Sequence, residues 1–478
     1  MFLELDGNGP RYSQLTRALK QAILRGQLKA GSRLPATRVL ATELGLSRNT
    51  VLTAYEQLRD EQLAVSAVGA GTFVAAGVAP ACGEAERNEV AAQTRFASRL
   101  RRMPALSLSR LSRARYDLQY CEPVMDPRLA SAWRRELARS AMSGGWRYPP
   151  SAGLPALRQG IRDYLARRRG VVCSADDVVI VSGAQQAVSL LARVLLDEGD
   201  AVAVEDPGYQ LALHALRAHG ARLVPIRVDA DGLQVRKLPS AGLRMVHVTP
   251  SHQFPSGVVM SLERRLALLD YAAERQCWLV EDDYDGEFRY DGASIPALRS
   301  LDVRQRVIYI GSFSKVLFPG LRLGYVVCPR GLRDDLLGAK LLEDIGCGAI
   351  EQAALAELIA CGAFDRHLRR TAAELRRRRA ALMDALRRHC RKHLSPSDSR
   401  AGMHLVGWLP GWSAAQVQAL VGRALERGLG LHPIGPHYLI HPAPPGLLLG
   451  YGALSVKQLR EAALLLGACL DEGAVRAA

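Results

Sequence analysis

Near its beginning the chain shows the hydrophobic spacing of a short amphipathic helix. Leu15, Leu19, Ala22 and Ile23 recur three or four residues apart, which places them on one face of a helix over residues 12–24. The polar residues between them would face solvent. This segment therefore predicts the first helix of a small domain.

Two further helices are predicted after it, joined by a tight turn. Pro35 suits the first turn of a helix over residues 36–43, and Gly45 suits its end. Ser47 can then accept a hydrogen bond from the first turn of a third helix, residues 48–61. Two helices joined by so short a glycine turn form a helix-turn-helix.

A hairpin pattern follows the third helix. Residues 64–68 and 72–74 are rich in small and β-branched residues and flank a glycine-containing turn, which predicts the wing of a winged helix. A recognition helix presents its N-terminal residues to the major groove. Here these are Arg48, Asn49 and Thr50, whose side chains can bond phosphates or base edges.

From Asp117 onward, apolar strands alternate with amphipathic helices. Strands are predicted at residues 178–182, 201–205, 222–228, 245–249, 278–282, 307–310 and 325–328, and helices at 184–196 and 262–275. This alternation predicts an α/β domain with a mainly parallel sheet covered by helices. Ligands of such sheets bind at the carboxyl ends of the strands.

The strand at residues 307–310 ends beside an unusual group of polar residues. Lys315 follows it closely, and a neutral lysine amine is a nucleophile for aldehydes. Ser312, Ser314 and Arg322 could hold a phosphate on the same ligand. An aldehyde that carries a phosphate describes pyridoxal 5'-phosphate (PLP). For this segment alone, a solvated loop lysine beside a structural arginine is the alternative.

Two other strand ends suit the same ligand. Gly183, Ala184 and Gln185 lie between a strand and a helix, where free backbone amides bind phosphate. Asp282 ends the strand WLVED, and a buried carboxylate there could bond a protonated pyridine nitrogen.

Two tyrosines complete the candidate set. Tyr284 follows the strand WLVED and could reach the ring hydroxyl, and Tyr209, in EDPGYQ, could stack on the ring. Taken singly, each candidate has an ordinary structural explanation, namely a tight turn, a cap or a core aromatic. Their joint order along the chain favours a PLP site.

Composition narrows the class of protein. The chain has 478 residues, of which 48% are hydrophobic, so it is long enough for two or more globular domains. It has no apolar run of membrane-spanning length and no signal-peptide pattern. Its nine cysteines form no CxxC pair, so neither a metal site nor a disulfide framework is predicted. These features predict a cytoplasmic protein without a membrane partner.

The charge balance points to an anionic partner. The formal net charge is +16 and the pI is about 9.7. Such a surplus favours an anionic polymer, although it does not distinguish DNA, RNA and membrane. Arginine-rich codon usage is the simpler explanation.

Between the two patterned regions the periodicity fails, which predicts a linker. Its second half carries arginines without intervening acids, at Arg95, Arg99, Arg101, Arg102, Arg110, Arg113 and Arg115. These could hold DNA phosphates or simply solubilise a tether. The predicted domains are residues 11–76 for DNA binding, 77–114 for the arginine-rich linker and 115–478 for a PLP-binding effector domain.

The N-terminal region resembles the GntR-type winged-helix domain. The matching text is AILRGQLKAGSRLPATRVLATELGLSRNTVLTAYEQLRDEQL, followed by GAGTFV. The resemblance implies that the chain binds double-stranded operator DNA. The implied contacts are Arg38 on the second helix, Arg48, Asn49 and Thr50 on the third, and Gly69 in the wing.

The rest of the chain resembles a fold-type I PLP-dependent aminotransferase, and the whole chain resembles the MocR subfamily of GntR regulators. The matching phrases are YPPSAGLPALRQGIRDYL, SGAQQA, EDPGY, TPSHQFPSG, EDDYDGEFRY and GSFSKVLFPGLRLGY. By this resemblance Lys315 binds PLP covalently and Tyr209 stacks on its ring. Asp282 pairs with the pyridine nitrogen and Tyr284 with the ring oxygen. The implied phosphate ligands are Gly183, Ala184, Gln185, Ser312 and Arg322, with Tyr148 reaching the phosphate of the partner subunit in a homodimer.

Two departures from the enzymes of this fold concern the substrate. Phe254 stands where they keep an asparagine near the ring oxygen, so His252 or Gln253 is expected to substitute. They also hold a substrate carboxylate with an arginine near the C-terminal strand, whereas here no arginine occurs between Arg427 and Arg460. The nearby basic groups are His432, His437 and His441. Efficient transamination is therefore in doubt.

Together these features predict a PLP-dependent DNA-binding transcriptional regulator rather than an enzyme. Its aminotransferase-like domain would sense a small-molecule effector and control vitamin B6 or amino-compound genes. The effector could be PLP itself, or an amine or amino acid as in γ-aminobutyrate, taurine or ectoine regulators. The alternative is an active aminotransferase with a fused DNA-binding domain.

Overall fold

The chain folds into two separate units. The computed structural model describes residues 5–67, 70–76, 94–104, 114–143, 147–290, 296–399 and 401–475. Contacts divide the chain between Gln93 and Thr94, within the predicted linker. Each unit has its own hydrophobic core.

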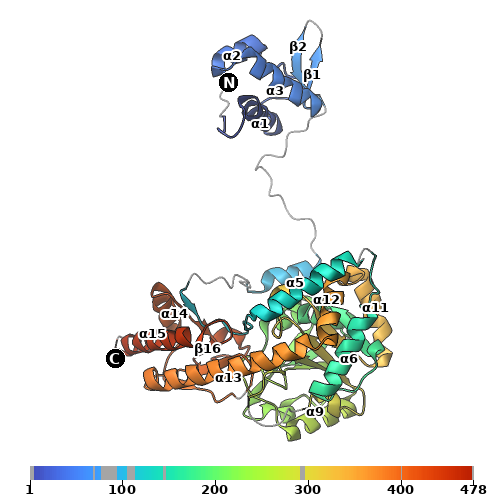
Figure 1. The fold of residues 1–478 in the computed structure, drawn as a ribbon, viewed down its shortest axis with the longest axis vertical. Helices are drawn as coiled ribbons and strands as arrows, with labels where there is room; N and C mark the ends of the chain where they lie inside the picture. Colours follow the sequence, from blue (N-terminus) through green and yellow to red (C-terminus); the bar gives the residue numbers. More distant parts are fainter. Residues whose placement is uncertain are drawn as a thin grey trace. The chain divides into compact units, whose positions relative to one another are not determined.

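The first unit is a winged helix-turn-helix (Figure 1). Its elements are α1 (Arg11–Leu24), α2 (Thr37–Leu44), α3 (Arg48–Asp60), β1 (Ala64–Ala67) and β2 (Gly71–Val74). The two strands pair antiparallel, with Ala64 opposite Val74. All five elements lie where the sequence predicts them.

The core of the first unit explains this agreement. Leu15, Leu19, Val51 and Leu58 are fully buried together, so the periodic faces of α1 and α3 meet. The hydroxyl of Ser47 accepts a hydrogen bond from the backbone N–H of Thr50 at 3.1 Å and caps α3. A single cap of this kind stabilises a helix by about 1 kcal/mol.

The second unit is built on an eight-stranded sheet. Its strand order is β4 (Val178–Val181), β11 (Gly324–Val327), β10 (Val307–Ser312), β9 (Trp278–Asp283), β8 (Leu243–Val248), β5 (Ala201–Asp206), β6 (Arg222–Asp229) and β7 (Gly232–Leu233). The five strands from β10 to β6 are parallel. Strand β11 is antiparallel to both neighbours, because the short connection from β10 leaves no room for a crossover helix.

Helices cover both faces of this sheet (Figure 1). In β5, Val202 and Val204 belong to one core cluster, whereas Ala201 and Ala203 belong to another, as expected where alternate residues face opposite layers. The helices of this part are α5 (Pro127–Met142), α6 (Pro155–Arg169), α7 (Ala184–Leu195), α8 (Gln210–Ala218), α9 (Leu262–Arg275), α10 (Leu298–Leu301), α11 (Arg330–Asp344) and α12 (Ala349–Ala360). The α/β fold class is therefore confirmed.

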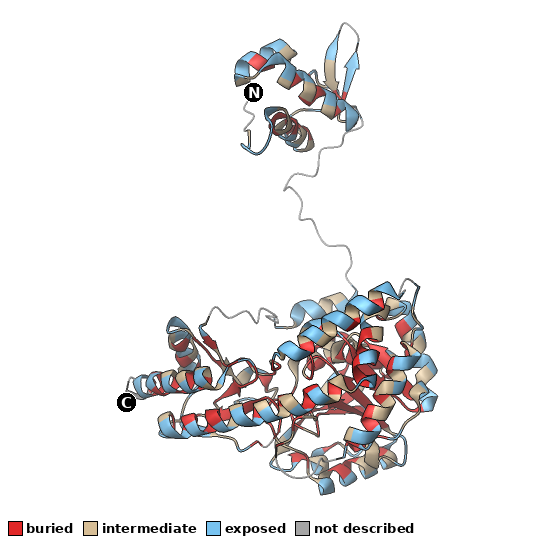
Figure 2. Ribbon diagram, in the orientation of Figure 1, coloured by how far each residue is buried: buried red, intermediate tan, exposed pale blue. Residues whose placement is uncertain are grey.

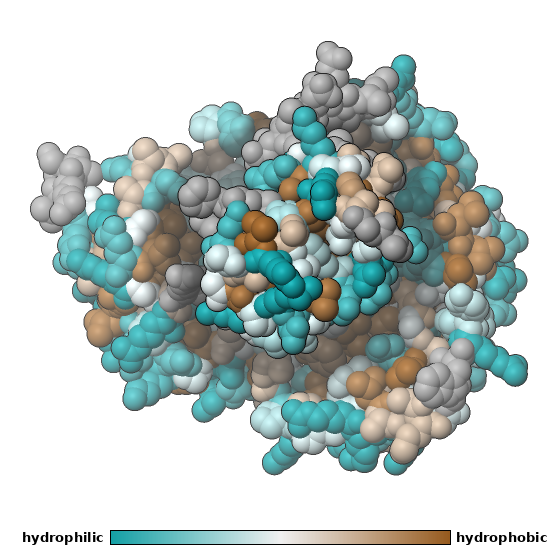
Figure 3. All heavy atoms as spheres, turned by 90° about the horizontal axis from the view of Figure 1, so that it is seen from above, coloured by the Kyte–Doolittle hydropathy of each residue, from teal (hydrophilic) through white to brown (hydrophobic). Residues whose placement is uncertain are grey.

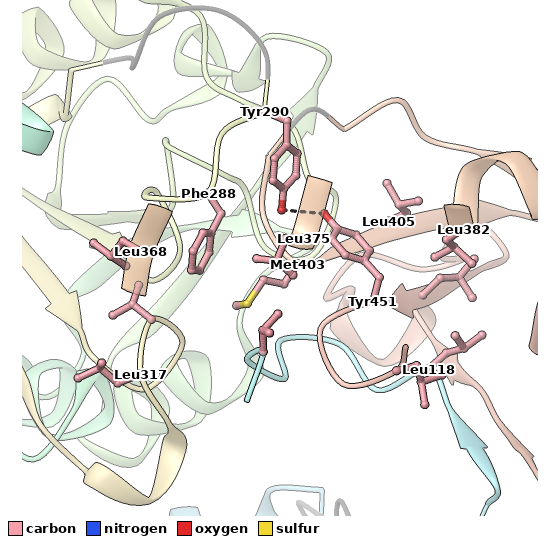
Figure 4. Close-up of a cluster of buried hydrophobic side chains, with 14 of the residues drawn as sticks. Leu118, Phe288, Tyr290, Leu317, Leu368, Leu375, Leu382, Met403, Leu405 and Tyr451 are labelled. Carbon is pink, nitrogen blue, oxygen red and sulfur yellow. Dashed lines mark hydrogen bonds between the residues drawn. The ribbon is translucent and has the colours of Figure 1, made fainter. Parts of the chain in front are cut away.

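A smaller C-terminal part contains a second sheet, ordered β12 (Ser395–Pro396), β13 (His404–Trp408), β16 (Gly446–Gly450) and β15 (His432–Pro433). Strands β3 (Tyr116–Asp117) and β14 (Leu429–Gly430) pair separately. The helices are α13 (Ala363–His389), α14 (Ala414–Glu426) and α15 (Val456–Val475). Figure 4 shows Leu368, Leu375 and Leu382 of α13 in the cluster that joins this part to the large sheet.

One helix of the predicted linker belongs to the second unit. Helix α4 (Arg95–Arg102) packs against α8. The Nε of Arg99 donates to the carbonyl oxygen of Ala218 at 2.9 Å, and both Arg95 and Arg99 form ion pairs with Glu198. These two arginines are thus occupied within the unit. Arg110 and Arg113 lie outside the described residues.

Polar side chains predominate on the face shown in Figure 3. Figure 3 shows hydrophilic side chains over much of the visible surface, interrupted by separate hydrophobic patches. In the described part of the chain, no helix is both long and apolar enough to cross a membrane.

The cluster of Figure 4 makes a stability prediction. Leu375 is fully buried, so Leu375→Ala should lower the free energy of unfolding of the second unit by about 2–5 kcal/mol. Tryptophan fluorescence during denaturant unfolding measures this, because all five tryptophans lie outside residues 1–93. The control Leu464→Ala removes a side chain that is 56% exposed and should change stability by less than about 0.5 kcal/mol.

Candidate functional site

A cavity of about 390 Å³ lies at the carboxyl ends of the parallel strands. Its lining includes nine of the residues predicted to bind a cofactor, namely Ala184, Gln185, Tyr209, Asp282, Tyr284, Ser312, Ser314, Lys315 and Arg322. They come from five separate segments of the sequence. The sheet therefore brings together residues that the sequence spreads over more than 130 positions.

Two predicted residues do not line the cavity. Gly183 lies just behind it as the N-cap of α7, with φ +83°. A Cβ atom there would approach the guanidinium of Arg322 to 3.2 Å, so glycine leaves room for that side chain. Tyr148 does not line the cavity, and it is 83% exposed.

One end of the cavity suits an anion. Helix α7 begins here without a side-chain cap, so its first backbone amides are open to a ligand. The Nη2 of Arg322 donates to the carbonyl oxygen of Ser182 at 2.8 Å, which leaves its other donors for a phosphate. The hydroxyl of Ser314 is buried and has no hydrogen-bond partner among the described residues.

The other end holds a carboxyl group that lacks a donor. The Oδ1 of Asp282 is buried without a hydrogen-bond partner among the described residues, and Oδ2 lies 3.8 Å from Nε2 of His247. Burial, reinforced by Asp283, Glu205 and Asp285, raises the pKa of Asp282 to about 7. A protonated ring nitrogen would supply the missing donor and favour the ionised carboxylate.

Tyr284 begins a chain of hydrogen bonds that leads away from the cavity. Its hydroxyl lies 2.8 Å from Nδ1 of His252. That nitrogen also lies 2.9 Å from Oδ2 of Asp285, and Nε2 of His252 lies 3.2 Å from the hydroxyl of Ser399. All of these contacts hold the phenol of Tyr284 in place.

Neither residue expected to replace the asparagine lines the cavity. His252 is occupied by Tyr284 and Asp285. The Nε2 of Gln253 donates to the carbonyl oxygens of Pro207 and Phe254, and its Oε1 accepts from Ser256. Phe254 does line the cavity, so this wall is aromatic where the side chain of His252 or Gln253 was expected.

Two positions at the end of β16 leave no room for a side chain. A Cβ atom at Gly450 would lie 1.9 Å from the carbonyl oxygen of Gln119, and one at Gly452 would lie 1.7 Å from that of Glu122. The backbone of residues 119–122 therefore occupies this space. Among the lining residues, Arg322 is the one arginine, and it lies at the anion end. His432, His437 and His441 do not line the cavity.

Sequence reasoning missed several lining residues. Thr249 ends a predicted strand. Because ligands of parallel sheets bind at the carboxyl ends of strands, the sequence could have identified it. Tyr120 and Cys121 follow the two-residue strand β3, which is too short to leave a periodic signal. Cys121 has φ +58°, a left-handed conformation that is uncommon outside glycine.

The cavity residues fit PLP. Lys315 offers an amine to an aldehyde, the start of α7 and Arg322 offer donors to a phosphate, and Asp282 lacks a donor that a pyridinium would supply. The described residues contain no group of three side chains arranged to hold a metal ion.

The predicted DNA contacts lie on the surface of the first unit. Arg38 on α2, and Arg48 and Asn49 at the start of α3, are exposed. Thr50 is half-buried, and its hydroxyl lies 2.8 Å from that of Ser47. Gly69 lies outside the described residues.

Comparison with known families assigns both units. Residues 11–74 match the gntR family of bacterial regulatory proteins, and residues 119–433 match aminotransferase class I and II. The solved structure of LysN, the α-aminoadipate aminotransferase of Thermus thermophilus, is 28% identical, with a TM-score of 0.72, and the match covers 80% of this chain and 98% of that one.

Relatives that span the whole chain are regulators. The probable rhizopine catabolism regulatory protein MocR of Rhizobium meliloti is 37% identical over 96% of this chain and 94% of its own length. The pyridoxine biosynthesis transcriptional regulator PdxR of Corynebacterium glutamicum is 32% identical over 94% of this chain and 93% of its own length. The chain therefore belongs to the MocR subfamily of GntR-type transcriptional regulators, in which a winged helix precedes an aminotransferase-like domain.

Proposed function

We propose that this regulator binds PLP through Lys315 and uses its aminotransferase-like unit to sense a small-molecule effector. The observation that carries the proposal is the single cavity in which the amine of Lys315, the uncapped start of α7 and the unpartnered Asp282 face one another. PLP, when bound, supplies an aldehyde for amines and an electron-withdrawing ring.

The chain's own residues would hold this cofactor from three sides. Arg322 and the amides of α7 bind its phosphate, and Asp282 accepts a hydrogen bond from its ring nitrogen. Tyr209 covers the ring. The phenol of Tyr284, held by His252, donates to the ring oxygen.

The cavity favours a sensor over an efficient enzyme. The aminotransferases of this fold clamp a substrate carboxylate with arginine, whereas no arginine occurs between Arg427 and Arg460 here, and Gly450 and Gly452 have no space for a side chain. The wall near this point is aromatic, with Tyr120 and Phe254 at 5.6 Å between ring centroids. An effector without a carboxylate, such as PLP or a simple amine, suits this wall best. The relative named for pyridoxine biosynthesis supports PLP and vitamin B6 genes.

A homodimer would complete the site. Tyr148 resembles a residue that reaches the partner's phosphate, and its exposed side chain is free to do so. Met142, which ends α5 nearby, is 82% exposed, as expected for an apolar side chain that a second subunit covers.

An active aminotransferase is the second candidate, because the fold is that of LysN. Steady-state turnover over a panel of amino acids separates the two functions. A regulator should show slow or partial transamination, whereas sustained turnover at the rates typical of enzymes would favour the second candidate.

Lys315→Ala should remove the visible absorbance of covalently bound PLP, since it removes the amine. The control Lys457→Ala changes a lysine on the surface of α15 and should keep the band. Arg322→Ala should keep the band but weaken PLP binding by about 1.5–3 kcal/mol, because it removes a charged hydrogen bond. Survival of the band in Lys315→Ala would exclude this lysine.

Arg48→Ala should lower operator affinity by about 1–3 kcal/mol, because arginine at the start of a recognition helix reads base edges. Arg38→Ala should also weaken binding. Arg59→Ala, in the last turn of the same helix, is the control. Gel-shift affinity measures all three, and equal affinities for the Arg48 and Arg59 variants would remove Arg48 from the interface.

Where PLP itself is the effector, PLP and operator DNA must alter each other's affinity by the same factor. Titration of PLP into the apoprotein should therefore give different dissociation constants with and without operator DNA. The difference should vanish in Arg48→Ala at DNA concentrations that this variant does not bind. Equal constants for the unmodified protein would leave PLP as a structural cofactor only.

A further inference from the structure

The basic surplus of the chain lies almost entirely in the second unit. The net charge is +16, yet residues 1–93 contain ten basic and nine acidic side chains. Within residues 11–76, the winged helix alone has nine basic and four acidic side chains, so it holds only a small part of the surplus. Neutralisation of phosphates supplies most sequence-independent DNA affinity. A cluster of basic side chains on the second unit is therefore a candidate surface for binding DNA phosphates.

Helix α13 carries several of the second unit's basic side chains on its exposed face. We define its basic stripe as the exposed residues Arg366, Arg369, Arg376, Arg377, Arg387 and Arg388. At 3.6 residues per turn, these positions fall within an arc of roughly 120°. The opposite face carries Leu368, Leu375 and Leu382, which are buried in the cluster of Figure 4. Figure 2 shows buried and exposed residues alternating along this helix accordingly.

Most of the basic stripe has no acidic partner. Arg377 pairs with Glu374 at 2.9 Å, and Arg388 pairs with Asp384 at 3.4 Å. The described residues offer no carboxylate within ion-pair distance of the other four, Arg366, Arg369, Arg376 and Arg387. Like charges one turn apart repel one another, and a polyanion laid along the helix would relieve that repulsion.

We propose that the basic stripe of α13 is a second DNA-contacting surface, which binds the phosphates of duplex that flanks the sequence read by α3. The proposal rests on DNA binding by the first unit and adds a sequence-independent surface to it. From Arg366 to Arg388 the stripe extends for about 33 Å, which is about one turn of B-DNA. Arginine is suited to the role because its planar guanidinium binds phosphate oxygens in pairs.

The covalent connection permits this contact. Residues 77–93 separate the last described residue of the first unit from Thr94, and a chain of this length spans at most about 60 Å. The second unit can therefore begin at up to this distance from the winged helix, so the connection does not confine it to the sequence that α3 reads.

The test compares two triple variants of the full-length protein with PLP bound. Arg369→Gln, Arg376→Gln and Arg387→Gln together remove three unpaired charges of the stripe. The control triple is Arg236→Gln, Lys237→Gln and Arg275→Gln, at exposed positions on other elements. Both triples lower the net charge equally. The probes are an operator duplex selected by the protein from random sequence and the same duplex extended by about 20 bp on each side, which exceeds the length of the stripe.

On the extended duplex, the stripe triple should bind at least about tenfold more weakly than the control triple at low salt, and its plot of log affinity against log salt should be shallower by about 2–3. On the short duplex the two triples should differ less. PLP absorbance and dimer size should be unchanged in both.

Equal affinity and equal salt dependence of the two triples on the extended duplex would overturn the proposal. A stripe that instead governs binding to anionic lipid vesicles, with DNA binding unchanged, would also overturn it. Failure of the unmodified protein to bind any duplex would contradict DNA binding by α3 itself, which is a different outcome.

Discussion

Strand β9 carries three consecutive carboxyl groups, Glu281, Asp282 and Asp283, into the interior of the second unit, where all three are buried. Two of them find donors within the protein. Glu281 accepts from the backbone amides of Leu298 and Arg299, each at 2.8 Å. Asp283 accepts at Oδ2 from the buried guanidinium of Arg169 and from the hydroxyl of Tyr309, although its Oδ1 has no partner among the described residues. Asp282, between them, accepts no hydrogen bond from the described residues at either oxygen, and Nε2 of His247 lies 3.8 Å from its Oδ2.

The difference in hydrogen bonding among these three carboxyl groups bears on the candidate cofactor site. A buried carboxyl without a donor is costly, and burial raises the pKa of Asp282 to about 7, which weakens its preference for the ionised form. A cationic ring nitrogen reverses both effects, because it offers a proton and a positive charge. The same strand that completes the core of the sheet therefore also holds a buried carboxyl group that a pyridinium would satisfy. The phosphate end, by contrast, depends on backbone amides and needs no unusual burial.

Much of this architecture follows from sequence patterns. The winged helix and the parallel strands have strong periodicity, and their ends locate Asp282, Lys315 and the start of α7 correctly in the fold. Other features depend on tertiary packing and leave no local signal. The antiparallel direction of β11 arises from a short connection. The cavity wall at Tyr120 and Cys121 follows a strand of only two residues. The amide of Gln253 is taken by backbone carbonyls that lie near it only in the folded chain.

The close approach of residues 119–122 to the end of β16 has a consequence for the evolution and redesign of the site. Any side chain at Gly450 or Gly452 would overlap a backbone carbonyl, and backbone atoms cannot move aside as a flexible side chain can. No single substitution at these two positions can therefore restore an arginine clamp. An arginine at either of these positions would require residues 119–122 to move first; otherwise the carboxylate-binding group has to be introduced at another position.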